Sequence, residues 1–342
     1  MLRTTAKGAL AVLAVSIAAA GAARAETIEL KISHIFPSSH FNQVRVLQPW
    51  ADEITKKTNG KVKFAIYAAG SALGDIGKQF DQVRAGATDI ALALPGVPRD
   101  RHPRTVLIEL PFVVRSSLTS TKVLHEMYDK FLAADFPGVR MLSLTSTNAG
   151  SIHSRVKPIK DIADLKGMRV RSPTPPITAM LEFIGATPVG LPPTQIYENA
   201  EKGTIDAVVM PWGPIGAFKL HEVLNHHMEA DTYVVSQYTV MNQRKYDSLP
   251  ADVKKVFDEV TAAHFSAERW SKVWNETDED ARQTALKRGH TIAPVAKETR
   301  EQWAKQLAPV IEKYLADQEK AGQKEVRAVF AEMRRLIGKY EK

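Results

Sequence analysis

Short strand-like segments and helical patterns alternate along this chain, and that alternation restricts the fold more than any other feature of the sequence. The first strand pattern is a period-2 segment at 27–33, and a helical spacing of apolar residues follows over 41–58. The same order repeats through a strand at 61–67, a helical stretch at 75–85 and a short apolar strand at 89–94. Strands separated by helices in this way predict a mostly parallel sheet covered by helices.

A second set of the same elements follows in the middle of the chain. It comprises a strand at 168–171, a helix at 177–185, an extended segment at 188–191, a helix at 194–202 and a strand at 206–210. In both sets a helix ends at a glycine, Gly86 or Gly203, and an aspartate three residues later begins an apolar strand. We therefore expect an α/β fold with two lobes of related design.

The last third of the chain has a helical character. From Pro250 the apolar residues keep a helical spacing through a charged stretch that continues to Arg288. A helix of this length can connect two lobes rather than lie within one of them. Two further amphipathic helices are expected at 299–318 and 324–340. The tryptophans in these and earlier helical stripes are expected in the core: Trp50, Trp270, Trp274 and Trp303.

The N-terminal segment has the three parts of a secretory signal peptide. Residues 1–7 are basic, residues 8–21 form an uncharged apolar run, and Ala23 and Ala25 are the small residues that a signal peptidase reads. The alternative is a membrane anchor, but the run is short and rich in alanine for a bilayer core of about 30 Å. We expect cleavage after Ala25 and an exported, soluble mature protein.

Composition narrows the possible chemistry. The chain has no cysteine, which excludes thiolate catalysis, cysteine-ligated zinc, iron–sulfur clusters and disulfides. Its net charge is +8, of which three charges belong to the basic residues of the signal segment. The remaining basic residues are scattered among acidic ones, so no nucleic-acid partner is expected.

The sequence carries no signature of a common enzyme class. It has no G-x-S-x-G elbow, no Walker loop and no G-x-G-x-x-G turn. The best metal candidate is the group His221, His226 and His227, but His221 and His226 are five residues apart rather than the four that place two ligands on one helix face. We interpret this group as the end of a surface helix. We expect no enzyme, no metal and no cofactor, with a periplasmic enzyme as a remote alternative.

Residues 161–173, with the sequence DIADLKGMRVRSP, resemble the signature of one protein family. The pattern is similar to that of the solute-binding subunits of tripartite ATP-independent periplasmic (TRAP) transporters of the DctP type. The resemblance extends over nearly the whole mature chain, through Gly185–Pro188, Gln195–Tyr197, Gly203–Asp206, Tyr67–Gly74, Gly86–Asp89 and Glu109–Phe112.

The resemblance implies a fold, a compartment and two partners. The fold would be a two-lobed periplasmic binding protein, α/β, with a long helix bridging the lobes. Residues 26–147 and about 236–275 would form the first lobe, and 148–235 and about 276–342 the second. The protein would be a periplasmic monomer that binds a small organic acid and delivers it to the TRAP membrane permease. A binding protein of another importer is the alternative.

Arg171 is the candidate for the central ligand contact. The resemblance implies that this arginine forms a salt bridge with the substrate carboxylate. Its place at the carboxyl end of a strand, two residues before Pro173, agrees, because ligands of open α/β sheets bind beyond the carboxyl ends of strands. A guanidinium can also hold a carboxylate through two parallel hydrogen bonds. The alternative is a surface arginine with an internal acidic partner, which is what we expect for Arg169.

Two departures from the family pattern bear on the ligand. The strand before the signature lacks the second arginine found in many members, and Asn148, Ser151 and His153 are the polar residues that remain there. A slot that is frequently asparagine holds Met210, followed by Trp212. We therefore expect one carboxylate on an apolar or aromatic body, with a dicarboxylate or a sugar acid as the alternative.

Other candidates lie where strands end, and each of them also has an ordinary packing explanation. They are His34, Phe36, Gly70, Leu94, Pro173, Gln237 and Tyr238.

Overall fold

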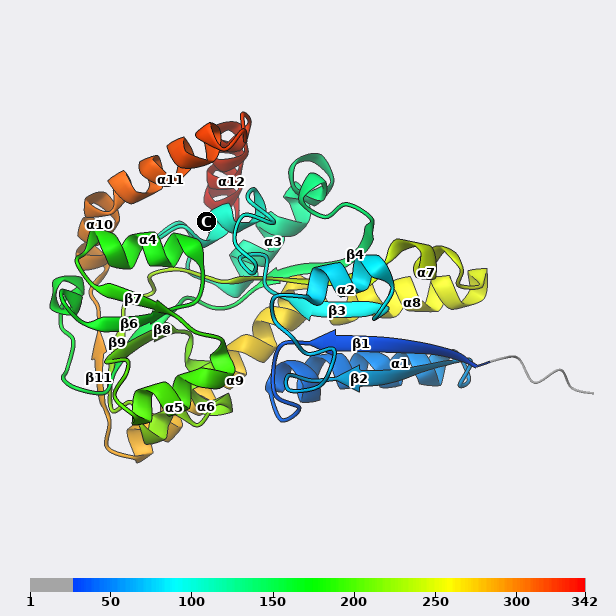
Figure 1. Ribbon diagram of the computed structural model, residues 1–342, viewed down its shortest axis with the longest axis horizontal. Coiled ribbons are helices and arrows are strands. Elements are labelled where there is room, and N and C mark those ends of the chain that lie inside the picture. The colour runs from blue at the N-terminus through cyan, green and yellow to red at the C-terminus, as the bar shows by residue number, and fades with distance from the viewer. Residues whose placement is uncertain (1–26, 342) are drawn as a thin grey trace, which may run out of the picture.

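Two separate β-sheets organise the chain, and each is the centre of one lobe (Figure 1). The computed structural model describes residues 27–341, so the expected signal peptide at 1–25 lies outside the described residues. The first sheet has the strand order β2-β1-β3-β10-β4, and the second has the order β11-β9-β5-β8-β6-β7. The expected two-lobed α/β fold is confirmed.

The strands fall largely where the sequence patterns predict them. The first sheet contains β1 (Ile28–His34), β2 (Val62–Tyr67), β3 (Ile90–Ala93), β4 (Val139–Ser146) and β10 (Ser236–Asn242). The second contains β5 (Ser151–Ser154), β6 (Arg169–Ser172), β7 (Thr187–Gly190), β8 (Ala207–Met210), β9 (His226–Glu229) and β11 (Thr291–Pro294).

Each sheet contains one antiparallel strand, and in each case the chain has just crossed from the other lobe. β5 follows β4 and runs antiparallel to both β8 and β9. β10 follows β9 and runs antiparallel to both β3 and β4. The two crossing segments, 147–150 and 230–235, therefore join the lobes directly.

Helices cover both sheets. Those before residue 250 are α1 (Gln48–Lys57), α2 (Gln79–Ala85), α3 (Ser117–Met127), α4 (Pro175–Phe183), α5 (Ile196–Glu201), α6 (Trp212–Ala217) and α7 (Gln243–Asp247). The later ones are α8 (Ala251–His264), α9 (Ala267–Lys287), α10 (Lys297–Gln306), α11 (Ala308–Lys320) and α12 (Val326–Tyr340).

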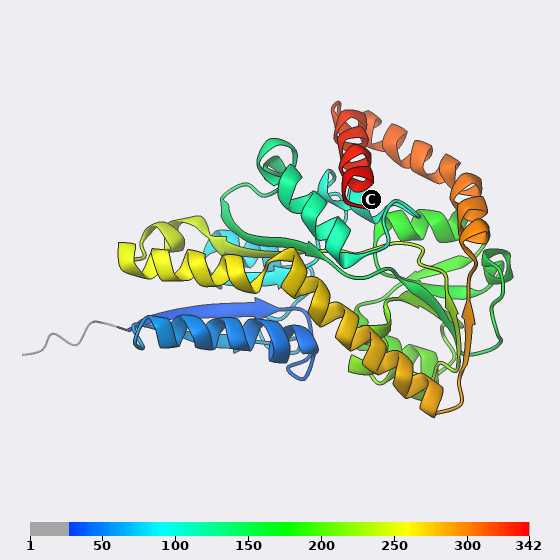
Figure 2. The ribbon, with the colours of Figure 1, turned by 180° about the vertical axis from the view of Figure 1, so that it is seen from behind.

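The long helix expected from residue 250 to 288 is divided into α8 and α9. The backbone of Ser266 is extended, with φ −58° and ψ 147°, and this interrupts the helix. The second part, α9, packs against α3 of the first lobe and α6 of the second, and Figure 2 shows it running from one lobe to the other. The helix expected at 299–318 is likewise divided, because α11 begins with Pro309 in its first turn, and proline cannot continue a preceding helix.

The C-terminal helices contact both lobes. α11 packs against α4 of the second lobe, whereas α12 packs against α3 of the first. The last part of the chain is therefore not confined to one lobe, and the boundaries at 147/148 and 235/236 remain a proposal.

The core contains the tryptophans expected there. Trp50, Trp270 and Trp274 are fully buried, and Trp303 is nearly so. The Trp50 indole donates to Thr261 Oγ1 at 3.1 Å and the Trp270 indole donates to the Ser146 carbonyl at 2.7 Å, so both polar edges are satisfied. The second of these bonds ties α9 to the end of β4.

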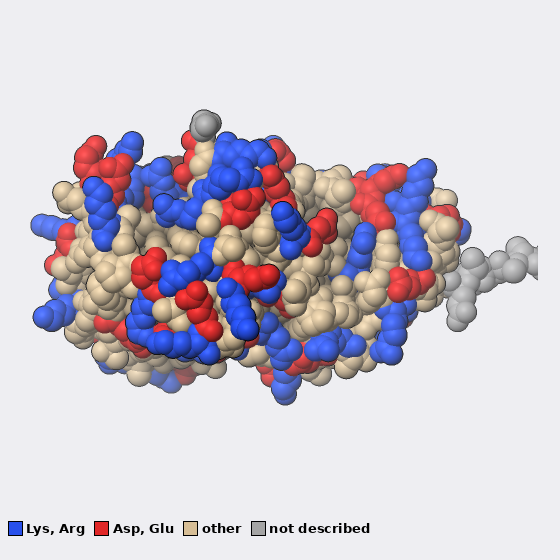
Figure 3. All heavy atoms as spheres, turned by 90° about the horizontal axis from the view of Figure 1, so that it is seen from above, with Lys and Arg blue, Asp and Glu red and all other residues tan. Residues whose placement is uncertain are grey.

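The surface carries both signs of charge. In the view of Figure 3, lysine and arginine side chains are interspersed with aspartate and glutamate over the visible face. Within residues 27–341, none of the helices combines the length and the apolar character that crossing a bilayer requires.

The approach of Gly150 to Tyr233 yields a stability prediction. A Cβ atom on Gly150 would lie 2.3 Å from Tyr233 Cε1, and the Tyr233 ring is fully buried. We expect Gly150→Ala to lower the free energy of unfolding by about 1–3 kcal/mol, because the ring has to move.

Urea unfolding at neutral pH measures this effect, and Gly338→Ala in α12 is the control. A Cβ atom at Gly338 meets nothing within 4 Å, so we expect that variant to gain about 0.4–1 kcal/mol. Equal stability of the two variants would contradict the packing argument.

Candidate ligand-binding site

The strand ends of the second sheet bring the expected residues of this lobe to one edge. β6 and β8 are parallel, so their carboxyl ends share that edge, and antiparallel β5 begins there. Arg171 pairs with Val208, which pairs with His153, and Met210 pairs with Ser151. Paired residues share a face, as do residues two apart in one strand. Arg171, His153, Met210 and Ser151 therefore lie on the same face of the sheet.

Arg171 is a buried cation without an acidic partner among residues 27–341. Its side chain is only 3% exposed, and its Nε donates to the Leu191 carbonyl at 3.2 Å. Burial lowers the pKa of its guanidinium to about 10 against the smaller Coulombic effect of the Tyr233 phenol, and no Asp or Glu among residues 27–341 opposes that shift. A buried charge is costly unless it is paired, so this position favours an anion supplied from outside the chain.

Arg169 shows the opposite arrangement two residues earlier. It is exposed, and its guanidinium binds Asp206 through Nε to Oδ2 at 3.0 Å and Nη2 to Oδ1 at 2.6 Å. The internal acidic partner expected for Arg169 is therefore present. Because the Asp206 carboxylate already neutralises Arg169, this arginine is not free to bind a ligand.

Trp212 is the first residue of α6, and one proline separates it from Met210 in the sequence. Its side chain is 6% exposed, and its indole nitrogen donates to Glu229 Oε1 at 3.2 Å. The same carboxylate oxygen accepts from Arg282 Nε of α9 at 2.7 Å. The ring also meets His153 edge to face, with centroids 5.0 Å apart. These contacts fix the indole beside Met210.

In the first lobe, His34 and Leu94 lie on one face at the ends of β1 and β3. His34 pairs with Leu92, so Leu94, two residues further along, shares its side of the sheet. Phe36 N donates to His34 Nδ1 at 3.3 Å, which leaves the His34 Nε2 hydrogen for Gln43 Oε1 at 2.8 Å. Burial lowers the pKa of His34, so the ring is neutral there.

Phe36 is buried beside these residues. Its ring stacks on His40 at 4.2 Å, and its carbonyl accepts from Ala69 N at 2.8 Å. Gly70 follows in an exposed loop with φ +88° beyond the edge strand β2. Pro173 is half-buried between Arg171 and α4.

Two expected residues occupy other places. Tyr238 pairs with Ala93 rather than Leu94, so it lies on the opposite face of the sheet from His34, packed against Phe80 of α2. Its neighbour Gln237, also a candidate, faces the His34 side of the sheet, because successive side chains of a strand point to opposite faces. The Gln237 amide oxygen accepts a hydrogen bond from Asn42 at 3.3 Å.

Asn148 is the second expected residue that the fold places elsewhere. Its Oδ1 accepts from Ser117 N of α3 at 3.2 Å, and its Nδ2 donates to Asn275 and Asp278 of α9. The side chain therefore fastens the crossing segment to two helices.

The interpretation of His221, His226 and His227 as a surface helix end is wrong. His226 and His227 belong to strand β9, and His227 is buried at 3% exposure. Within the part of the chain that the structure describes, no group of three or more His, Asp and Glu side chains is arranged to hold a metal ion.

The two lobes touch each other close to the expected site residues Leu94, Pro173 and Phe36. A Cβ atom on Gly96 of the first lobe would lie 2.9 Å from Thr174 Cγ2 of the second. The His40 ring meets the Phe218 ring across the lobes at 5.4 Å between centroids. The two lobes are therefore in contact at these positions.

Two carboxyl groups that were not among the expected site residues lie along the junction: Glu109 is fully buried and Asp278 is half-buried. Glu109 accepts hydrogen bonds from the backbone and the hydroxyl of Ser236, and burial raises its pKa to about 7. Asp278 of α9 accepts from Gly213 N at 2.6 Å and from Asn148 Nδ2 at 3.0 Å, and burial raises its pKa to about 7 as well. The hydrogen-bond partners of both carboxyl groups come from distant parts of the chain, so these contacts exist only in the folded protein.

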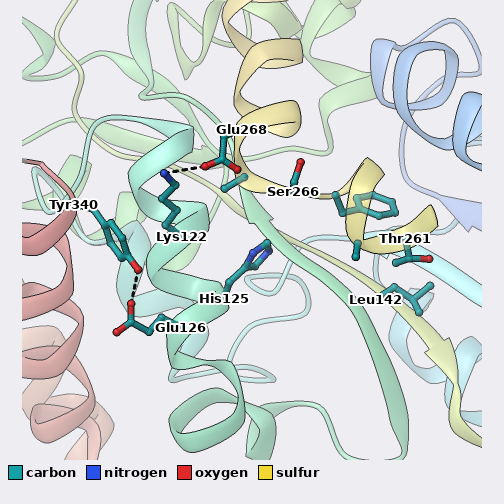
Figure 4. Close-up of a pocket in the computed structure, with 11 residues that line it drawn as sticks. Lys122, His125, Glu126, Leu142, Thr261, Ser266, Glu268 and Tyr340 are labelled. Carbon is teal, nitrogen blue, oxygen red and sulfur yellow. Dashed lines mark hydrogen bonds and ion pairs between the residues drawn. The ribbon is translucent and has the colours of Figure 1, made fainter. Parts of the chain in front are cut away.

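The larger open cavities lie away from Arg171. One of about 840 Å³ lies between α4, α11 and the loop at 99–100. Another, of about 650 Å³, lies at the junction of α8 and α9, where Lys122 pairs with Glu268 and Tyr340 with Glu126 (Figure 4). None of the expected site residues lines either of these two cavities.

Comparison with known proteins agrees with the expected family of solute-binding proteins. The family model of the bacterial extracellular solute-binding proteins, family 7, matches residues 32–318 of this chain. A solute-binding protein of Albidiferax ferrireducens is 28% identical over 257 residues, which cover 70% of this chain and 72% of that protein.

Two solved structures of TRAP solute-binding proteins are similar over nearly their full length. One, from Rhodoferax ferrireducens, holds copurified benzoate and has a TM-score of 0.87 at 29% identity, covering 92% of this chain and 99% of that one. The other, from a marine metagenome, is specific for aromatic acid ligands and holds 3-hydroxybenzoate. Its TM-score is 0.84 at 31% identity, and the match covers 93% of this chain and all of that one.

The raised pKa of Glu109 predicts a pH dependence of stability. The folded state keeps the Glu109 proton up to about pH 7, whereas the unfolded chain releases it near 4.5. The stabilisation is complete below pH 4.5 and is lost as the pH rises through 7, by at most about 3 kcal/mol. We expect Glu109→Gln to remove this loss, so that the variant is more stable than the wild type at pH 8.

Urea unfolding of both proteins between pH 5.5 and 8.5 checks this expectation. Glu301→Gln, at an exposed position of α10, is the control and should follow the wild-type pH dependence. Parallel curves for Glu109→Gln and the wild type would contradict the prediction.

Proposed function

The chain belongs to the bacterial extracellular solute-binding proteins of family 7, the solute receptors of TRAP transporters, and on that premise we propose that its ligand is an aromatic monocarboxylate. The ligand would bind between the lobes in the periplasm, and the closed complex would then deliver it to the TRAP membrane permease. The family consists of binding proteins, and we propose that this member binds its ligand without chemical turnover.

Arg171 carries this proposal. Its guanidinium is buried on the sheet face that also holds Met210 and Ser151, and no acidic side chain among residues 27–341 neutralises it. A carboxylate placed there would form charge-assisted hydrogen bonds, each worth about 1.5–3 kcal/mol. The ligand charge would thereby remove the cost of burying the cation.

The other residues at this edge of the sheet favour a ligand with a single carboxylate. Ser151 and Met210 are uncharged, His153 is neutral because burial lowers its pKa to about 4, and Arg169 is already paired with Asp206. Met210 and the Trp212 indole provide an apolar wall beside the cation. Benzoate and 3-hydroxybenzoate, the ligands of the two similar solved structures, have this combination of one carboxylate and a flat apolar body.

Binding would be coupled to closure of the lobes. Arg171 and Met210 belong to the second lobe, whereas His34 and Leu94 belong to the first. A ligand that contacts both groups has its full set of contacts only when the cleft is shut, so it shifts the population toward the closed form. The crossing segments and α9 would provide the hinge.

The first test of this proposal is Arg171→Lys. We expect the dissociation constant for benzoate, measured by isothermal titration calorimetry, to rise tenfold or more, since lysine cannot form two parallel hydrogen bonds to a carboxylate. Arg169→Lys is the matched control on the same strand and should bind like the wild type. Unchanged affinity in a folded Arg171→Lys protein would refute the role of Arg171.

A second test addresses closure. The added methyl group of Gly96→Ala would meet Thr174 of the opposite lobe, so we expect closure to cost about 1 kcal/mol or more and benzoate affinity to fall about fivefold or more. The melting temperature of the ligand-free protein should change little. Gly77→Ala, where the nearest atom is 3.5 Å away, is the control. Wild-type affinity in Gly96→Ala would contradict the closure argument.

A further inference from the structure

Three histidines from distant parts of the chain form a continuous chain of hydrogen bonds in the second lobe. His153 Nδ1 lies 2.7 Å from His227 Nδ1, and His227 Nε2 lies 3.0 Å from His290 Nδ1. At the inner end, His153 Nε2 lies 3.0 Å from the Met210 carbonyl oxygen. His153 and His227 are buried, whereas His290 is half-buried, so the chain leads from the surface to Met210.

The direction of these hydrogen bonds follows from the contact between His153 Nε2 and the Met210 carbonyl oxygen. A carbonyl oxygen only accepts, so His153 must carry its hydrogen on Nε2, and in the neutral ring its Nδ1 is then an acceptor. His227 must therefore donate from Nδ1, which leaves its Nε2 to accept from His290 Nδ1. Each neutral ring donates inward, and only the outer nitrogen of His290 is left for solvent.

This chain borders the proposed ligand site. Arg171, Val208, His153 and His227 form one register row across β6, β8, β5 and β9. The Trp212 ring contacts two members of that row, with centroid distances of 5.0 Å to His153 and 4.6 Å to His227. Met210 and Trp212, which form the apolar wall beside Arg171, are thus held by the same two imidazoles.

We propose that His153, His227 and His290 are positioning residues: an uncharged, directional chain that fixes the Met210 carbonyl and the Trp212 indole against the ligand, and that becomes charged against the indole when a proton is added. The part concerning the ligand rests on the proposed function, whereas the part concerning Trp212 does not. The class of ligand served is the aromatic acid whose ring would lie against this wall.

One added proton fits into the chain without loss of a hydrogen bond, because the outer nitrogen of His290 is free to take it. Shifting the hydrogens along the chain then moves the positive charge to His227 or His153, the two rings that lie against the Trp212 indole. A second added proton would place two hydrogens in one ring-to-ring contact. Burial lowers the pKa of both inner rings, that of His153 to about 4, which agrees with a chain that is neutral at ordinary pH.

Charged groups around the chain act on the same equilibrium. His226 acts on His227, and His221, His226 and Arg288 act on His290. Arg171 lies in the same register row, and Glu229, Arg282 and Asp278 bond to the neighbouring Trp212, Glu229 and Gly213 respectively. Glu229 is paired with Arg282, and Arg288 together with the neighbouring histidines opposes protonation of His290. Within residues 27–341, the charges that act on the three rings are therefore those of other histidines and Arg288, and none of them is a carboxylate.

The first experiment uses the ligand-free protein and follows the Trp212 fluorescence, taken as the difference between the wild type and Trp212→Phe, from pH 7.5 to 4. We expect this signal to change on acidification, with a midpoint below pH 6, while the far-ultraviolet circular dichroism remains folded. The double variant His153→Gln with His227→Gln, in which neither ring against the indole can be protonated, should show no such transition. A constant wild-type signal, or the same transition in the double variant, would overturn the positioning role.

The second experiment measures benzoate and 3-hydroxybenzoate affinity at pH 7.5. We expect His153→Leu to bind about tenfold more weakly, because the Met210 carbonyl and the His227 N–H lose their partner. His153→Gln should recover most of that loss. The matched control is His226→Gln, whose ring bonds Thr291 on the exposed side of β9.

The outcomes separate the two proposals. Wild-type affinity in His153→Leu would overturn the positioning role in the site. If the Trp212 transition occurs as expected but neither acid binds the wild type, the histidine chain is supported and the proposed ligand class is refuted.

Discussion

The unpaired charge of Arg171 is the feature around which the rest of the site is arranged. Burying a guanidinium without a counter-ion is costly, and this chain pairs the neighbouring Arg169 with Asp206 while leaving Arg171 without an acid among residues 27–341. The folded protein therefore retains an electrostatic deficit that a carboxylate can remove. On the proposed function, ligand binding would neutralise this buried charge. The surrounding residues would then decide which carboxylate fits, since Ser151 and Met210 add no second charge.

On the proposed function, the connection between the lobes would convert that local interaction into a movement of the whole molecule. Asp278 of α9 accepts hydrogen bonds from Asn148 in a crossing segment and from Gly213 at the start of α6. The helix that spans both lobes is thus fastened to the hinge and also to the element that carries Trp212. A change in the angle between the lobes has to be accommodated at these bonds. Contacts such as Gly96 against Thr174 limit how far the cleft can shut.

Selectivity in this site would come from neutral polar groups as much as from apolar ones. The histidine chain satisfies the Met210 carbonyl and supports the Trp212 indole without adding charge beside Arg171. A lysine or arginine in its place would attract a second carboxylate. Neutral imidazoles buried in this way also oppose acidification, because unfolded histidines bind protons more readily than these do.

Much of the fold follows from sequence periodicity. The alternation of strands and helices determined the two-lobed α/β class, the glycine turns determined where helices end, and the strand before Pro173 placed Arg171 at a carboxyl edge. Local sequence patterns did not predict the side-chain positions that depend on contacts between distant segments. Strand pleating turns Tyr238 away from His34 and Gln237 toward it, which depends on the register with β3. Pairing of β5, β9 and β11 brings His153, His227 and His290 together from positions more than 60 residues apart, and only the folded sheet makes them neighbours. The sequence by itself determined which groups could bind a carboxylate; tertiary structure alone decided which of them are buried, paired and facing one another, because burial and pairing are properties of neighbours that the chain meets only on folding.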